Sequence, residues 1–321
     1  MAAADGNRYN QAGLNPGGAD RVVVADPETT EFNQAFVRHS ARELVLTLGR
    51  QRLVLDRARF VGDVGWRQNA QTFDAAVVTS RPLAGLTLTG AYVGRVNRIF
   101  GNAHPQGNWD SDSFLLHGTY AGLPAGVSLN AYAYLLDFEQ AAAQGSATYG
   151  ASLVGAPRLS DGLTLSCRAE FAWQTDYGSS PLDYGVGYGA AEAGLVFKRG
   201  GLAVGGELLG ADHGAAFRTP LATLHAFNGW ADRFLSTPED GLRDVYLKGT
   251  GSLPGGIGLA ALFHRFTSKS GDNGFGREWD LQLSRAFRPS LTGLLKFARF
   301  SPDTPGWPKV SKVWLQVEFL H

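Results

Sequence analysis

The sequence predicts an all-β fold, an antiparallel transmembrane β-barrel. The first observation is a strict alternation of apolar and polar residues with no helical period, which is typical of strands that face lipid on one side and water on the other. In the segment 312–319, for example, Val313, Leu315, Val317 and Phe319 share one face. The second observation is that short and long connections alternate between the strands. The third is that no run of about 18 apolar residues occurs, so the sequence contains no transmembrane helix.

The first eight expected strands alternate between segments of charged, Gly or Pro residues. In chain order they are 30–38, 44–53, 73–80, 86–97, 112–121, 127–137, 147–156 and 163–176. Most are near the about 9–11 residues that a tilted membrane strand needs. The last of them is the clearest, because Leu165, Phe171 and Trp173 share one face while Arg168 and Glu170 share the other.

Seven further strands complete the expected barrel wall, which gives about 15 in this chain. They are 185–198, 202–211, 242–252, 257–267, 277–287, 291–300 and 311–320. The short connections are 39–43, 81–85, 122–126, 157–162, 199–201, 253–256 and 288–290, and the long ones are 54–72, 98–111, 138–146, 175–184, 212–241, 268–276 and 301–310. Short periplasmic turns that alternate with long extracellular loops are typical of a bacterial outer-membrane barrel.

The expected strand count is odd, whereas bacterial single-chain barrels have an even number of strands. Residues 1–27 are rich in Gly and Asn and read as an extracellular loop, and we expect residues 28–321 to form a single barrel domain. We therefore expect an odd number of strands, most simply one or three, and a signal peptide upstream of this sequence. With three, the barrel has 18 strands.

Composition excludes several functional classes. Lys and Arg together number 29, as do Asp and Glu, and this balance argues against a nucleic-acid partner, which needs a basic excess. The single cysteine, Cys167, excludes a disulfide framework and a cysteine zinc site. No HExxH, GxSxG or Walker sequence is present. We expect no metal, no cofactor and no enzymatic activity.

Several segments resemble the alginate export porin family. The longest are RFVGDVGWRQNAQTFD at 59–74 and TPLATLHAFNGWADRF at 219–234, and shorter ones are TEFNQAF at 30–36, LGRQRL at 48–53, VNRIFG at 96–101, AEFAWQTDYG at 169–178, HRF at 264–266 and EWDL at 278–281. The resemblance implies an 18-stranded outer-membrane barrel that passes polymers or solutes by diffusion, with an anionic polysaccharide such as alginate as the substrate.

The polar strand faces give the expected pore-lining residues. They are Asp74, Arg95, Arg168, Glu170, Glu192, Lys198, Glu207, Asp244, Lys248, His264, Glu278, Asp280, Lys296, Lys312 and Glu318. This mixture is not a net positive funnel, and an anion-selective constriction needs a basic excess at its narrowest point. Loop residues supply candidates for that constriction: Arg50, Arg52, Arg59, Arg67, His225 and Trp230. The arginines among them have an alternative role, which is to bridge loop carboxylates and backbone.

Segment 217–235 is unlike an ordinary exposed loop. Pro220 is compatible with the first turn of a helix capped by Thr219, and Leu221, Leu224 and Phe227 then follow helical spacing. An apolar segment of this kind is expected to fold into the barrel mouth, as a constriction or plug, or else to pack on neighbouring loops.

Tyrosines and a tryptophan on the expected lumen face have two readings, a sugar-binding surface or structural packing. They are Tyr132, Tyr134, Tyr188, Tyr246 and Trp314.

Two functions remain from different classes. The first is an outer-membrane porin or export channel, embedded in the lipid bilayer, that passes an anionic polysaccharide or small polar solutes. The second is a barrel enzyme or a structural barrel without an open pore, for which His264 beside Glu278 or Asp280 is the carboxylate–histidine group to consider. An open polar lumen favours the first, and an occluded one favours the second.

Overall fold

The computed structural model describes residues 30–67, 69–303, 305 and 307–319. One antiparallel sheet dominates it, and fifteen strands follow one another along this sheet as nearest neighbours. They are β1 (Ala35–Ala41), β2 (Leu44–Gln51), β3 (Thr72–Leu83), β4 (Leu86–Asn97), β5 (Asn108–Tyr120), β6 (Val127–Leu136), β7 (Ser146–Gly155), β9 (Leu163–Thr175), β10 (Gly185–Phe197), β11 (Gly200–Leu209), β14 (Leu242–Leu253), β15 (Ile257–Thr267), β16 (Gly274–Arg288), β17 (Leu291–Pro302) and β18 (Val310–Phe319).

Three short strands complete the set. Strand β8 (Arg158–Ser160) pairs with the start of β9, and β12 (Ala211–Asp212) pairs with β13 (Ala215–Ala216) in a small hairpin. Helical structure in the described residues is limited to 3-10 turns at Asp56–Ala58, Pro124–Gly126, Glu139–Gln144 and Leu224–Ala226. None of the helices described is long and apolar enough to cross a membrane. The all-β antiparallel meander predicted from the sequence is thus confirmed.

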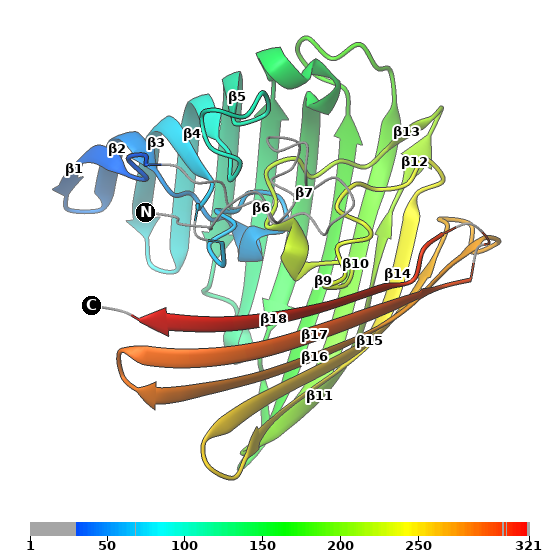
Figure 1. Ribbon diagram of the computed structural model, residues 1–321. Coiled ribbons are helices and arrows are strands. Elements are labelled where there is room, and N and C mark those ends of the chain that lie inside the picture. The colour runs from blue at the N-terminus through cyan, green and yellow to red at the C-terminus, as the bar shows by residue number, and fades with distance from the viewer. Residues whose placement is uncertain (1–29, 68, 304, 306, 320–321) are drawn as a thin grey trace.

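The sheet is strongly curved and wraps around two segments of the chain (Figure 1). Its path runs from β1 at one end to β18 at the other, and the two ends face each other across these segments. Residues 1–27, which we expected to form an extracellular loop, lie outside the described residues.

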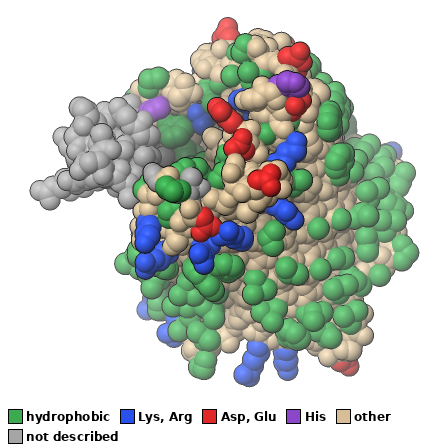
Figure 2. Space-filling view, turned by 90° about the vertical axis from the view of Figure 1, so that its right-hand side faces the viewer, with side chains coloured by type: hydrophobic (Ala, Val, Ile, Leu, Met, Phe, Trp, Pro, Cys, Tyr) green, Lys and Arg blue, Asp and Glu red, His purple; other side chains and the backbone are tan. Residues whose placement is uncertain are grey.

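Alternate residues of each strand face the inside or the outside of the curve. On β18, Val313, Leu315 and Val317 are exposed on the outside, while Lys312 and Trp314 are half-buried on the inside. Figure 2 shows one side of the molecule, with hydrophobic side chains spread over its lower right part and most charged side chains gathered above and to the left. An apolar outer face and a more polar inner face are what a sheet between lipid and a polar interior requires.

Candidate functional site: two loops inside the curved sheet

Two long connections fold into the space that the sheet encloses. The first inward loop, residues 52–71, joins β2 to β3, and the second inward loop, residues 210–241, joins β11 to β14. The backbone N–H of Gly62 donates to the carbonyl of Leu221 at 2.8 Å, and the N–H of Thr223 donates to the carbonyl of Ala58 at 3.0 Å. Because these bonds cross between the loops, the two segments form one structural unit.

Side chains reinforce this junction. The amide of Gln71 donates to the carbonyls of Gly62, at 2.8 Å, and Leu221, at 3.1 Å. A Cβ atom on Gly62 would lie 2.4 Å from the Thr223 hydroxyl oxygen and 2.6 Å from the Ala58 Cβ. Only glycine therefore permits the two backbones to approach so closely.

Arg59 anchors the first inward loop to the wall. Its guanidinium, 1% exposed, donates to both carboxylate oxygens of Glu207 on β11, at 3.1 and 2.9 Å. It also lies 4.7 Å from the ring centre of Phe227 in the second inward loop. Burial alone would lower the pKa of Arg59, but the Glu207 carboxylate overrides that effect and the pKa is raised. This two-point ion pair joins a loop and a strand 148 residues apart.

Asn228 extends the same network along the wall. Its amide donates to Glu207 at 3.2 Å and to Asp244 on β14 at 3.3 Å. Asp244 in turn contacts Nδ1 of His264 on β15 at 3.0 Å. Each of these polar groups is buried, so the hydrogen bonds offset a desolvation cost that would otherwise oppose the arrangement.

Two carboxylates of β16 hold the next residues of the second inward loop through its backbone. The N–H of Trp230 donates to Asp280 at 3.2 Å, and the N–H of Ala231 donates to Glu278 at 2.6 Å. A Cβ on Gly229 would lie 2.7 Å from the Glu278 carboxylate. The wall acids expected in the lumen thus bind a loop.

A histidine–aspartate pair fastens the loop to the last strands. Nδ1 of His225 contacts Asp232 at 2.6 Å, Lys312 donates to Asp232 at 2.7 Å, and Lys296 contacts Nε2 of His225 at 2.8 Å. The indole of Trp66 stacks on the imidazole at 4.1 Å between ring centres. Burial lowers the pKa of His225, whereas Asp232 opposes this effect. A neutral ring that donates from Nδ1 and accepts at Nε2 fits these contacts.

Phe60 inserts an aromatic ring into a tyrosine cluster on the wall. Its ring centre lies 5.2 Å from that of Tyr132, 6.3 Å from Tyr134 and 5.3 Å from Tyr188. The Tyr132 hydroxyl donates to Glu170, which also pairs with Arg168. These inward tyrosines pack against the protein's own loop, which is the packing role considered for them.

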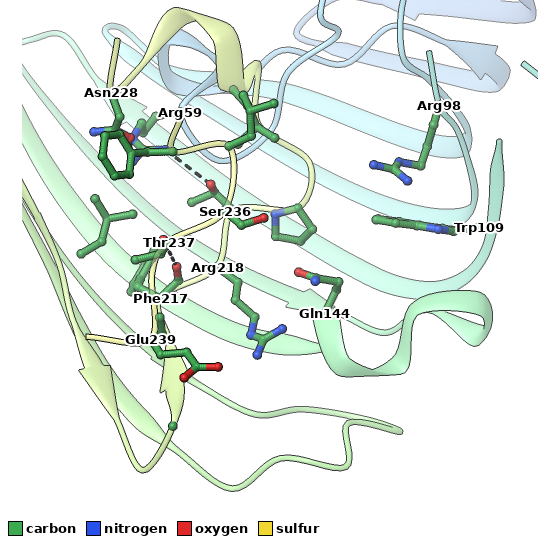
Figure 3. Close-up of a pocket in the computed structure, with 18 residues that line it drawn as sticks. Arg59, Arg98, Trp109, Gln144, Phe217, Arg218, Asn228, Ser236, Thr237 and Glu239 are labelled. Atoms are coloured by element: carbon green, nitrogen blue, oxygen red, sulfur yellow. Dashed lines mark hydrogen bonds between the residues drawn. The ribbon is translucent and has the colours of Figure 1, made fainter. Parts of the chain in front are cut away.

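A cavity of about 380 Å³ remains between the second inward loop and the wall around β5. Its polar lining includes Arg98, Gln144, Arg218, Ser236, Thr237 and Glu239. In Figure 3, the side chains of Arg98 and Arg218 point into the space between this loop and Trp109.

The two cavity arginines differ from Arg59 in their partners. Arg98 lies 3.9 Å from the ring centre of Trp109 and donates to the carbonyl of Gln106 at 3.2 Å. Burial lowers its pKa to about 10, so it stays cationic at neutral pH. No ion pair joins either Arg98 or Arg218 to a carboxylate of the described residues. Both cations are thus available to a solute.

The structure brings most of the expected pore-lining residues to the inner face. Those that contact the inward loops or their anchors are Glu207, Asp244, His264, Glu278, Asp280, Lys296 and Lys312. Those that lie along the wall are Arg168, Glu170 and Glu192. The side chain of Lys248 is half-buried on β14. Lys198 and Glu318 are exposed at the short-turn end. Among the loop candidates, Arg59, His225 and Trp230 lie inside, Arg67 lies over the Trp66 ring, and Arg52 is exposed near Asp63.

Three placements differ from the expectation. Arg50, Asp74 and Arg95 lie in register across β2, β3 and β4, on the face opposite the buried Gln51, Phe73 and Val96. An irregularity between Val93 and Arg95 shifts β4, so strict alternation assigns Arg95 to the wrong side. These three charged side chains therefore face outward.

The expected helix after Thr219 is also absent from the second inward loop. Only a 3-10 turn forms, at Leu224–Ala226, and the backbone torsions of Thr223 before it are not helical. The carbonyl of Leu221 accepts from Gly62 and Gln71 and is not free for a helical bond. The second loop uses its backbone to bind the first, and helical spacing in the sequence does not reveal that competition.

Sequence reasoning missed Arg98, Trp109, Gln144, Arg218 and Asn228. Each belongs to, or borders, a long connection, where no alternation assigns a side. The sequence feature that could have pointed to these residues is the length of the connections that carry them, since long loops commonly carry function.

Comparisons with known proteins support this fold. No protein-family model and no curated protein sequence matches the chain. Among solved structures, it is similar to the outer membrane protein OpdK of Pseudomonas aeruginosa, with 16% identity over 88% of this chain and 78% of that one and a TM-score of 0.68. It is also similar to OpdK with vanillate, at 15% identity, 88% and 77% coverage and a TM-score of 0.70. OccAB2 of Acinetobacter baumannii is similar with 15% identity over 88% of this chain and 75% of that one, and the TM-score is 0.70.

These matches correct the family assignment made from the sequence. The structural neighbours are OpdK and OccAB proteins, so the resemblance to alginate export porins was misleading and an alginate substrate is not supported. The two long segments that carried the resemblance, 59–74 and 219–234, therefore do not identify the family.

Proposed function

We propose that this chain forms a passive diffusion channel for small polar solutes in the bacterial outer membrane. The observation that carries the proposal is the pair of inward loops, fixed inside a curved sheet whose outer face is apolar. Loops held in this way narrow a lumen, and a cavity of about 380 Å³ remains beside them. The fold similarity to an outer membrane protein supports the same setting.

The solutes best suited to this cavity are small and carry a carboxylate or another anionic group. A volume of about 380 Å³ lies in the range of small-molecule sites. Arg98 and Arg218 supply positive charge, and neither makes an ion pair with a carboxylate in the described part of the chain. One similar solved structure is described as OpdK with vanillate, a small aromatic carboxylate, which fits this chemistry.

Planar-bilayer recording tests the proposal. The wild-type chain is expected to conduct, with a reversal potential in a salt gradient that indicates anion preference, and vanillate is expected to reduce the current. Arg98→Gln/Arg218→Gln should lose that preference, because cations at a constriction attract anions. Arg81→Gln, at an exposed site in β3 near the short-turn end, is the control and should behave as wild type. A folded wild-type protein that never conducts would contradict the channel.

An enzymatic barrel has less support. His264 contacts Asp244, and Asp244 also accepts from Asn228, so this histidine helps to hold the second inward loop. Glu278 and Asp280 likewise accept loop N–H groups. Their contacts account for these residues as anchors. A barrel closed to all solutes is the remaining alternative, and the conductance measurement separates it from an open channel.

A further inference from the structure

Two rows of charged side chains lie on the outer face at the long-loop end of the sheet, on opposite parts of the wall. The first row, Arg50, Asp74, Arg95 and Asp110, runs across β2 to β5 in direct register. Arg50 pairs with Asp74 at 2.7 Å, and Arg95 pairs with Asp110 at 2.6 Å. With two arginines and two aspartates, this row is neutral and satisfied within itself.

The second row is different in charge. It consists of Arg243 on β14, Arg265 on β15, Arg277 on β16 and Arg299 on β17, all exposed. Arg265 lies directly opposite Arg277 in the register, an arrangement of like charges that is unfavourable on its own. Asp303 pairs with both of these arginines. We find no carboxylate partner for Arg243 or Arg299 among the residues described.

The four arginines are continuous across the four strands. Arg243 pairs with Thr267, two residues from Arg265, and Arg299 pairs with Trp279, two residues from Arg277. Diagonal neighbours of this kind on a sheet lie about 7–8 Å apart, within the reach of arginine side chains. Within the part of the chain that the structure describes, Asp303 is the one carboxylate that forms ion pairs with this row of four arginines.

Below this row, the outer face becomes apolar. Trp279 is 59% exposed and packs on Phe263 with ring centres 4.6 Å apart. Val245 and Leu247 continue the apolar surface on β14. An exposed tryptophan next to a cationic row marks the level at which lipid tails give way to headgroups.

We propose that the Arg243–Arg265–Arg277–Arg299 row binds the phosphate groups of an anionic lipid in the leaflet next to the long loops. This inference rests on the proposed outer-membrane setting. Arginine suits the task because its planar guanidinium makes paired hydrogen bonds to phosphate oxygens. The lipid would supply the negative charge that Arg243 and Arg299 lack within the protein and relieve the repulsion between Arg265 and Arg277.

The test measures lipid binding to the full chain refolded in detergent. Lipid A with two phosphates is titrated by native mass spectrometry beside the same lipid without phosphates. The wild type should prefer the phosphorylated form. Arg243→Gln/Arg299→Gln should bind it roughly 30-fold more weakly, from the contribution of each basic residue near a charged membrane surface. This variant removes no ion pair between described residues, so it should fold.

Arg50→Gln/Arg95→Gln is the matched control, because it removes the same charge from the neutral row. It should change lipid A binding less than about threefold, since those arginines already have carboxylate partners. Equal losses in both variants, or no loss in the first, would overturn the proposal. Inorganic phosphate at millimolar concentration should not displace the lipid, and full displacement would assign the row to free phosphate instead. Conductance is measured in parallel on the same protein, so a failure of the proposed channel function can be told apart from a failure of lipid binding.

Discussion

Replacement of Arg59 tests whether one ion pair holds the inward loops in place. In Arg59→Met, the Glu207 carboxylate stays buried and loses both guanidinium bonds, at 3.1 and 2.9 Å. Removal of one partner from a buried ion pair costs about 3–5 kcal/mol. The lost contact of the guanidinium with the Phe227 ring, at 4.7 Å, adds about 1 kcal/mol.

A second substitution separates the ion pair from packing. In Arg59→Met/Glu207→Gln no charge remains unpaired, and replacement of both partners is commonly close to neutral. We therefore expect the double variant to be more stable than Arg59→Met by about 2–4 kcal/mol, the part due to the stranded charge. Unfolding in urea from lipid vesicles measures the free energies. Conductance measures the position of the loops and should rise in Arg59→Met.

If the single and double variants unfold at the same urea concentration and conduct alike, the Arg59–Glu207 pair does not hold the loops. Their position would then depend on backbone bonds such as Gly62 to Leu221.

Three further predictions concern pH, packing and the outer face. Because the pKa of His225 is lowered in the fold, the folded protein favours the neutral ring. The contribution of this residue to folding stability is therefore fully present above the unfolded pKa of about 6.5 and declines as the pH falls below it. Conductance should accordingly rise from pH 7.5 to 5 in the wild type but not in His225→Gln. Gly62→Val should separate the inward loops, since its first side-chain atom would lie 2.4 Å from Thr223, and faster hydrogen exchange across 56–62 would report it; unchanged protection contradicts the packing argument. Leu116→Arg, on the outer face, should destabilise by about 2–4 kcal/mol, whereas His117→Arg on the inner face should be tolerated, and equal urea midpoints would show that the faces are misassigned.

Much of the wall was predictable because it depends on local patterns. Period-two alternation gave the strands and the faces of most of their residues, as with Glu207 and Lys296, since a strand in lipid has to present apolar side chains outward at every second position. Even there, the irregularity at Val93 and Arg95 reversed the side of Arg95, because a one-residue insertion inverts the alternation. The expectation of further strands upstream stays a prediction.

The interior was decided by tertiary structure. The sequence identified 217–235 as an inward-folding candidate from its apolar character and placed Arg59 in a long loop, yet it could not pair Arg59 with Glu207 or Gly62 with Leu221. Such contacts join residues about 150 positions apart, and no periodicity links them. The alternation therefore determined the sheet, whereas the cavity with Arg98 and Arg218 exists only because the sheet curves and brings two distant loops together in its interior.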